Sequence, residues 1–121
     1  MSASRTPAQV AGGGAEDLAA EFLERHGLAI VARNYRTRVG EIDLIAHDRG
    51  TLVFVEVRLR KGGAFGGALA SITPAKRSRL VAAAKHYLMR LGREPFCRFD
   101  VIAVDEGGEP EWHRGAFDES C

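Results

Sequence analysis

The chain has 121 residues, of which 45% are hydrophobic and 27% are charged, values that are ordinary for a soluble globular protein. This length suits one domain with a single core. No apolar run approaches the roughly 20 residues that a membrane-spanning helix needs, and the N-terminus lacks the apolar core of a signal peptide, so we expect a cytoplasmic protein without a membrane partner.

The net charge of +1 conceals an uneven distribution of charge along the sequence. Between Arg33 and Arg98 there are 14 Lys and Arg but only 5 Asp and Glu, whereas the remaining residues carry 3 and 11. A basic middle segment indicates a surface for an anionic partner, and nucleic acid is the commonest such partner.

The two cysteines, Cys97 and Cys121, show no CxxC or Cys/His spacing. Neither a zinc site nor a disulfide framework is therefore indicated. We expect Cys97 to lie in or beside a strand as a small hydrophobic residue.

Residues 1–14 are small and polar, end in glycines and show no periodicity, so we expect a disordered tail followed by a single domain over residues 15–121. From Ala15 apolar residues recur every three or four positions, and Gly27 follows where a C-terminal glycine cap belongs, which predicts a helix of about three turns. Glu16 lies at the margin of the apolar stripe and can reach whatever the stripe packs against. An acid in the first turn can equally serve only to complement the helix dipole.

The centre of the chain predicts a β-hairpin. After a first strand over Leu28–Arg36, two apolar runs flank the turn residues 48–51 within the stretch Arg38–Arg60. A turn centred between residues 49 and 50 pairs His47 with Leu52, Ile45 with Phe54, and Asp43 with Glu56. Two carboxylates are then expected to face each other.

Directly opposed like charges are destabilising, so something should compensate for the Asp43–Glu56 pair. Arg58 projects on the same face as Glu56 because strand side chains alternate with period two, and it can neutralise both acids in a structural salt-bridge cluster. Alternatively, the two carboxylates hold a divalent metal, since hard cations such as Mg²⁺ take one or two carboxylates together with water and phosphate oxygens.

The second half of the chain predicts a loop, a helix and one or two strands. Residues 61–68 are too rich in glycine for regular structure and suggest a flap that orders on substrate. A helix over residues 71–91 opens near Pro74 and closes at Gly92. A strand follows at Phe96–Val104, in which Asp100 has no assigned partner, and a short edge strand is expected near Trp112. This order predicts a three-layer α/β domain with a central mixed sheet flanked by helices.

The helix over residues 71–91 carries a basic ridge, because Lys76, Arg79 and Arg90 fall on one side of a helical wheel. Such a ridge is most often a solvated face. Here no acidic residue between Ala75 and Arg93 can pair with it, which favours phosphate binding.

Several of these segments resemble one known family. Glu16, GEIDLIA (40–46), LVFVEVR (52–58) and RFDVIAV (98–104) closely resemble the YraN-type family, whose restriction-endonuclease-like fold is related to archaeal Holliday junction resolvases. The resemblance covers roughly residues 14–104. It implies the PD-(D/E)xK nuclease constellation of a helix acid at Glu16, a strand Asp at Asp43, and an ExK triplet beginning at Glu56.

This sequence departs from the constellation at one position, since the lysine of ExK is Arg58. A guanidinium stays protonated in proteins and cannot act as a general base, whereas a lysine with a lowered pKa can. Arginine can still bind the scissile phosphate, and metal-assisted hydrolysis does not require a lysine. Lys61 and Lys76 are conceivable substitutes.

Three functions follow as hypotheses. The first is an Mg²⁺- or Mn²⁺-dependent endonuclease acting on DNA, with branched or damaged DNA suggested by the resemblance; Asp43 and Glu56 would ligate the metal, Glu16 would support the site, and Arg58 would bind phosphate. The second is a nucleic-acid-binding module that keeps the fold without cleavage, and the third is a protein-interaction module. The resemblance also suggests that the protein forms a homodimer, because related resolvases cut two strands symmetrically. The expected nucleic-acid contacts are Arg36, Arg38, Arg60, Lys61, Lys76, Arg79 and Arg90.

Overall fold

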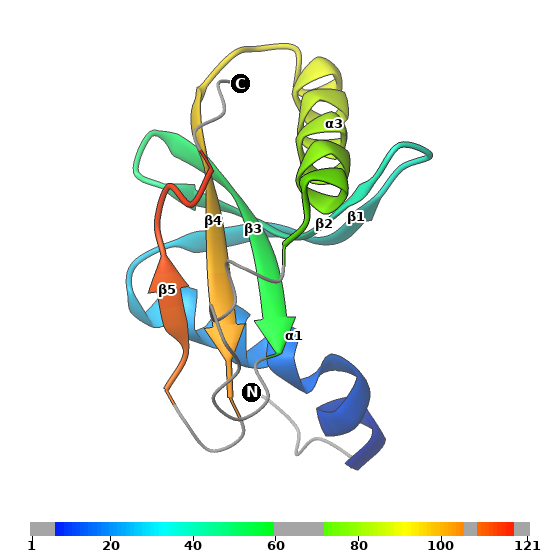
Figure 1. Cartoon of the computed structure of the whole chain (residues 1–121). Helices are drawn as coiled ribbons and strands as arrows, with labels where there is room; N and C mark the ends of the chain where they lie inside the picture. Colours follow the sequence, from blue (N-terminus) through cyan, green and yellow to red (C-terminus); the bar gives the residue numbers. More distant parts are fainter. Residues whose placement is uncertain (1–6, 60–71, 106–108, 118–121) are drawn as a thin grey trace.

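The computed structural model describes residues 7–59, 72–105 and 109–117, with side chains from residue 14 onward. The five strands form one sheet in the order β1-β2-β3-β4-β5, in which β3 and β4 run parallel and the other neighbours run antiparallel (Figure 1). The fold is therefore α/β with a mixed sheet, as the sequence predicts. The elements are α1 (Pro7–Arg25), β1 (Ala29–Arg36), β2 (Glu41–Asp48), β3 (Thr51–Leu59), α3 (Pro74–Leu91), β4 (Phe96–Val104) and β5 (Glu111–His113).

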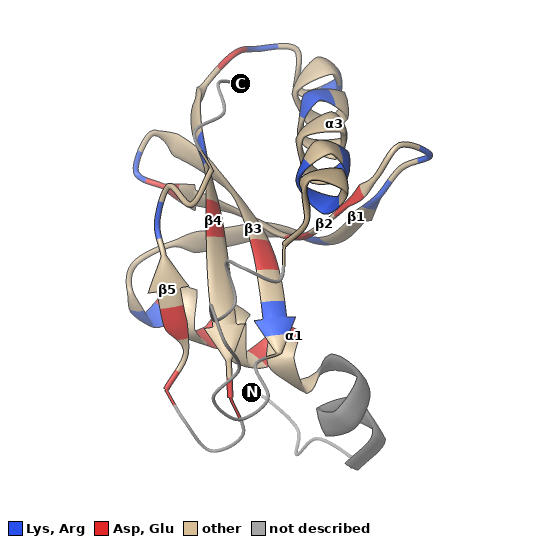
Figure 2. Ribbon diagram, in the orientation of Figure 1, with Lys and Arg blue, Asp and Glu red and all other residues tan. Residues whose placement is uncertain are grey.

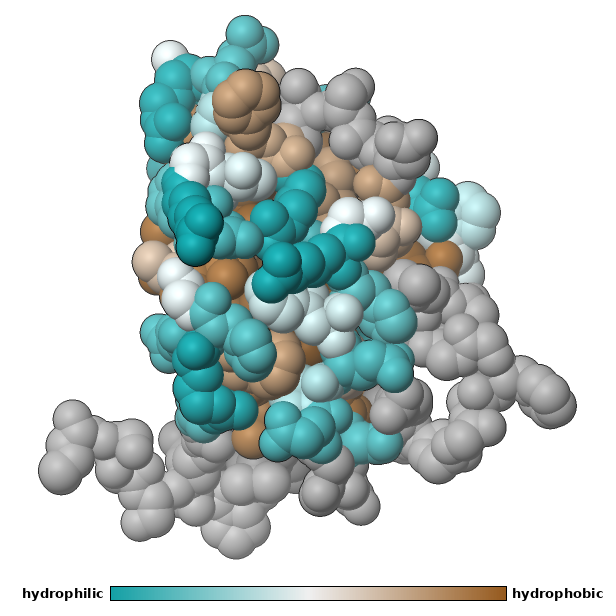
Figure 3. Space-filling view, turned by 90° about the vertical axis from the view of Figure 1, so that its left-hand side faces the viewer, coloured by the Kyte–Doolittle hydropathy of each residue, from teal (hydrophilic) through white to brown (hydrophobic). Residues whose placement is uncertain are grey.

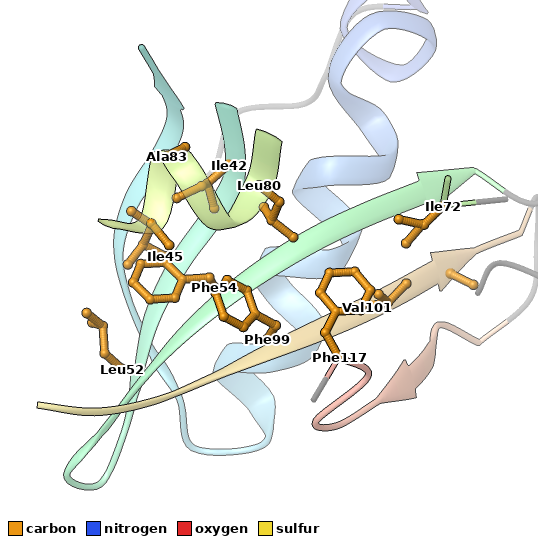
Figure 4. Close-up of a cluster of buried hydrophobic side chains, with 12 residues drawn as sticks. Ile42, Ile45, Leu52, Phe54, Ile72, Leu80, Ala83, Phe99, Val101 and Phe117 are labelled. Atoms are coloured by element: carbon orange, nitrogen blue, oxygen red, sulfur yellow. The ribbon is translucent and has the colours of Figure 1, made fainter. Parts of the chain in front are cut away.

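Helices α1 and α3 cover opposite faces of the sheet, and each packs on the strand side chains that point to its side. On β3, Phe54 packs in a cluster with Leu80 and Ala83 of α3, whereas Val53 and Val55 pack in a second cluster with α1. Figure 4 shows the first cluster, in which the Phe54 and Phe99 rings stack with their centroids 5.4 Å apart. The result is three layers with a core on each side of the sheet.

The register of the central hairpin is confirmed where the strands pair. His47 lies opposite Leu52 and Ile45 lies opposite Phe54, as a turn centred between residues 49 and 50 requires. Arg49 adopts a left-handed φ of 57°, a conformation that a two-residue turn between antiparallel strands commonly demands.

The predicted opening of α3 near Pro74 and its predicted end at Gly92 are confirmed, and the structure adds Thr73 as the N-terminal cap. The Thr73 side chain accepts a hydrogen bond from the Lys76 backbone N–H at 3.1 Å, Pro74 follows in the first turn, and Gly92 closes the helix at a left-handed φ of 75°. The start of α1 is different from the expectation, because the helix begins at Pro7 rather than at Ala15. A proline suits the first helical turn, and the glycines at 12–14 lower helix propensity without interrupting the helix.

The sequence assigns no partner to Asp100, and the structure supplies three. Its side chain is 0% exposed and accepts hydrogen bonds from Arg98 Nε at 3.0 Å, from Trp112 Nε1 at 2.9 Å, and from the Gly115 backbone N–H at 2.9 Å. A buried carboxylate requires such donors. Asp100 thus ties β4 to β5 and to the turn that follows β5.

Cys97 lies in β4, as expected, and Cys121 lies outside the described residues. Neither helix in the described part of the chain is long and apolar enough to cross a membrane.

The face that carries β5 presents a mixed surface (Figure 3). Among the residues coloured there, hydrophilic atoms separate the hydrophobic ones into small patches. Scattered apolar residues of this kind are normal on a protein surface.

Gly40, between β1 and β2, lies against the backbone of α3. A Cβ atom built on Gly40 would lie 2.0 Å from the Arg79 carbonyl oxygen and 2.6 Å from its carbonyl carbon. Neither atom belongs to a flexible side chain that could move aside. The close approach therefore requires glycine at this position and sets the position of the β1–β2 connection relative to α3.

We predict that Gly40→Ala destabilises the protein by about 1–3 kcal/mol, because the connection and α3 must separate to admit the methyl group. Urea unfolding of the purified protein measures this loss. Gly50→Ala is the matched control, since a Cβ at Gly50 would meet nothing within 4 Å. Equal stability of the two variants would contradict the close approach.

We also predict that Asp100→Ala lowers the free energy of unfolding by about 3–5 kcal/mol, because the Trp112 Nε1–H and the Gly115 N–H lose their acceptor and the Arg98 guanidinium keeps only its ion pair with Asp48. Urea unfolding again provides the measurement, with the exposed Glu24→Ala as the control. A loss below about 1 kcal/mol would show that water replaces the carboxylate without penalty.

Candidate active site

A cleft of about 530 Å³ opens where β2 and β3 meet the first turns of α3. The β1–β2 connection (36–41) forms one wall and α3 forms another. Asp43 from β2 and Glu56 with Arg58 from β3 also line it. The cleft thus brings together the two carboxylates that the sequence places opposite each other. Basic residues from the β1–β2 connection and from α3 also line it.

The wall at 37–40 is held in shape by Thr37. The Thr37 hydroxyl accepts hydrogen bonds from the backbone N–H groups of Val39 and Gly40, both at 3.1 Å, and the Thr37 N–H donates to the Gly40 carbonyl at 2.8 Å. Because Gly40 also lies against α3, this tight connection places Arg36 and Arg38 beside the cleft.

The hairpin ladder stops one pair before the two acids. The last paired residues toward the cleft are Leu44 and Val55. Beyond them the Val57 backbone N–H donates to Asp43 Oδ2 at 2.8 Å. A side-chain carboxylate therefore accepts a hydrogen bond beyond the end of the backbone ladder.

The side chains of Asp43 and Glu56 lie close together, as predicted. Burial, the charge of Glu56 and a hydrogen bond to its carboxyl together raise the pKa of Asp43 from its ordinary 3.8 to about 7, while the hydrogen bond from the Val57 N–H acts in the opposite direction. Near neutral pH the pair therefore holds a proton that two separated carboxylates would release.

Arg58 projects on the same side as Glu56, as predicted from the strand period. Its Nη1 lies 3.2 Å from Glu56 Oε2, and the two side chains are 23% and 17% exposed. The hypothesis of a structural salt-bridge cluster predicts an ion pair with Arg58, and this ion pair is present at Glu56. The raised pKa of Asp43 shows that this cation does not cancel the repulsion between the two acids.

Glu16 approaches the pair from α1. Its Oε1 accepts hydrogen bonds from Asn34 Nδ2 at 2.9 Å and from Arg33 Nε at 3.3 Å. Burial raises the pKa of Glu16, Arg33 lowers it, and the Asp43 charge raises it. Glu16 therefore lies within electrostatic range of Asp43, although it is not among the described residues that line the cleft.

The predicted basic residues divide into groups. Arg36, Arg38, Lys76 and Arg79 line the cleft, and Arg36 also forms an ion pair with Glu41 at 3.3 Å. Arg90 is not among the residues that line the cleft. A rise of 1.5 Å per residue places it about 16 Å farther along α3 than Arg79. Figure 2 shows Lys and Arg along α3, which contains no acidic residue. Arg60, Lys61 and the glycine-rich loop lie outside the described residues.

The carboxylate pair matches the chemistry of a hard cation. In the described part of the chain no group of three or more His, Cys, Asp or Glu residues could hold a metal ion. Mg²⁺ does not require one, since it is commonly held by one or two carboxylates while water and substrate phosphates supply the other oxygens. Asp43 and Glu56 would satisfy that minimal donor set.

Asn34 and Gly40 are residues of the site that the sequence did not single out. Asn34 adopts a left-handed φ of 52°, which asparagine tolerates better than most residues, and it holds Glu16. A Thr-x-x-Gly connection and an asparagine within a strand are weak signals by themselves. Their roles depend on contacts with α3 and α1.

Comparison with known proteins places the chain in a family. Residues 15–104 match the "Uncharacterised protein family UPF0102". The chain belongs to UPF0102. This result confirms the family part of the YraN-type resemblance. The match includes Glu16 and the whole of β2, β3, α3 and β4.

Individual UPF0102 proteins are similar along nearly the whole chain. One from Cupriavidus pinatubonensis is 54% identical over 115 residues, covering 94% of this chain and 90% of the relative. Another from Cupriavidus taiwanensis is 58% identical over 111 residues, with coverage of 91% and 84%. A third from Psychromonas ingrahamii is 50% identical over 106 residues, covering 87% of each chain.

The pKa of Asp43 predicts a pH dependence of stability. Between about pH 4 and pH 7 the folded protein keeps a proton that the unfolded chain releases, so the contribution of Asp43 to stability falls as pH rises through this window. From pH 5 to pH 7 this amounts to about 2–3 kcal/mol. We predict that Asp43→Asn loses this contribution and is at least as stable as the wild type at pH 8.

Unfolding measured at pH 5 and pH 8 tests the prediction, with Glu24→Gln as an exposed control that retains the wild-type pH dependence. A variant that loses stability at pH 8 without added metal would instead identify Asp43 as part of a structural salt-bridge cluster.

Proposed function

We propose that this UPF0102 protein is a metal-dependent endonuclease that hydrolyses phosphodiester bonds in DNA, on a restriction-endonuclease-like fold. The observation that supports the proposal most strongly is the Asp43–Glu56 pair, which retains its mutual repulsion inside a cleft bordered by cations. A polyanionic substrate fits the cations, and a divalent metal fits the pair.

In this proposal Asp43 and Glu56 hold Mg²⁺ or Mn²⁺. When bound, such an ion supplies Lewis-acid polarisation of the scissile phosphate and activation of water. Because Asp43 holds a proton near neutral pH, ion binding is coupled to release of that proton. Glu16 adds negative charge near Asp43 and supports the site from α1.

The remaining residues bind and orient the strand. Arg58, which borders the acids, donates hydrogen bonds to the phosphate under attack, and a guanidinium suits this role because its donors match phosphate oxygens in pairs. Lys76 and Arg79 neutralise flanking phosphates from α3, while Arg36 and Arg38 do so from the β1–β2 connection.

A nucleic-acid-binding module without cleavage is the second candidate function. One observation favours it, namely that Arg58 occupies the position of the ExK lysine and forms an ion pair with Glu56. An arginine there cannot accept a proton from water. The cations of the cleft would serve binding equally well in both proposals.

We predict that Mn²⁺ binds with a midpoint no weaker than the millimolar range and that its affinity rises as pH is raised through about 7. Isothermal titration calorimetry of the wild type and Glu56→Gln measures the binding. Cleavage is assayed in parallel on single strands, duplexes, flaps and four-way junctions. Glu56→Gln should lower the cleavage rate by about 100-fold or more.

Glu41→Gln is the matched control, because Glu41 also lines the cleft but its side chain is 63% exposed and its ion pair with Arg36 lies at the surface. We expect this variant to retain metal binding and cleavage within about twofold. Absence of Mn²⁺ binding at millimolar metal with DNA present would overturn the nuclease proposal. Binding of both metal and DNA without cleavage of any substrate would favour the second candidate.

A further inference from the structure

Four polar residues form a row along one side of α3, where His86 contacts Tyr35 of β1. Lys76, Arg79, His86 and Arg90 are separated by three, seven and four residues, spacings that place side chains above one another on a helix. The row is about 21 Å long. Lys76 and Arg79 line the cleft, so the row leads from the paired acids to the other end of α3.

The row is interrupted by an aromatic pair that bridges α3 and β1. Tyr35 Oη and His86 Nδ1 are joined by a hydrogen bond of 2.6 Å, and their ring centroids lie 5.8 Å apart. Tyr35 is half-buried and packs edge-on against Tyr87 at 5.2 Å. His86 is exposed, and its ring is held at the Nδ1 edge by the Tyr35 hydroxyl.

This order of cation, aromatic ring and cation is unnecessary for contacts with a duplex backbone alone. Phosphates are neutralised by Arg and Lys, and the bases of an intact duplex are stacked on each other and cannot reach a ring on the protein surface. Surfaces that bind single strands combine a positively charged groove with exposed aromatic rings on which unpaired bases stack.

We propose that the row on α3 binds a DNA strand with unpaired bases, one of which stacks on His86 while the neighbouring phosphates contact Arg79 and Arg90. The proposal deepens the proposed function by naming the substrate class, a single strand or the unpaired arm of a branched DNA. Tyr35 is a positioning residue that fixes the His86 ring, and the adjacent Arg36 lines the cleft.

The test is fluorescence anisotropy with a labelled single strand of about 12 nucleotides and with a blunt duplex of the same sequence. EDTA is present, so cleavage cannot occur. His86→Ala should weaken single-strand binding by about 5- to 100-fold and leave duplex binding within about twofold. His113→Ala is the matched histidine control, because His113 lies on β5 at the opposite edge of the sheet and pairs with Glu111.

Unchanged single-strand affinity of His86→Ala would overturn the inference, as would an equal loss for single strand and duplex, which would indicate a phosphate contact only. The result of this binding test can be told apart from the result of the cleavage test of the proposed function. Loss of single-strand binding in the variant, in a protein that cuts no DNA with Mn²⁺, would support the row and reject the nuclease. Cleavage of duplex DNA by the wild type, together with single-strand binding that His86→Ala does not change, would support the nuclease and reject the row.

Discussion

The hydrogen bond from the Val57 N–H to the Asp43 carboxylate is the interaction on which the candidate site depends. Here the paired ladder ends at Leu44 and Val55, and a carboxylate accepts the next backbone donor. The same contact satisfies a backbone group that would otherwise lose its partner and holds Asp43 beside Glu56.

The surroundings of this pair keep the two acids partly buried and close to each other. Burial and mutual repulsion raise the pKa of Asp43, and the ion pair between Arg58 and Glu56 does not reverse this effect. Gly40 allows the β1–β2 connection to touch the backbone of α3, which brings cations from two segments to the same cleft. The repulsion between the two carboxylates and the cluster of cations around the cleft therefore have separate structural origins. The first comes from β2 and β3, and the second comes from the contact between the β1–β2 connection and α3.

Predictability of the fold and site depended on whether a feature was local. The hairpin register followed from two apolar runs and a turn, and the ends of α3 followed from Pro74 and Gly92, because these signals lie within a few residues of what they determine. Proximity of Asp43 to Glu56 followed from the same register. The end of the ladder at Leu44 did not, since alternation continues through Ile42 without any break in the pattern.

The sequence by itself determined the order of most elements, the mixed α/β class, the proximity of the two acids and the basic character of α3. Tertiary structure alone decided that Asn34 holds Glu16 near Asp43, that Gly40 lies against Arg79, and that Asp100 is satisfied by Arg98 and Trp112. It also decided that Arg90 lies far from the cleft while His86 meets Tyr35. The physical reason is that a periodic pattern identifies the buried face of an element, whereas the partner of each polar side chain depends on how the layers pack.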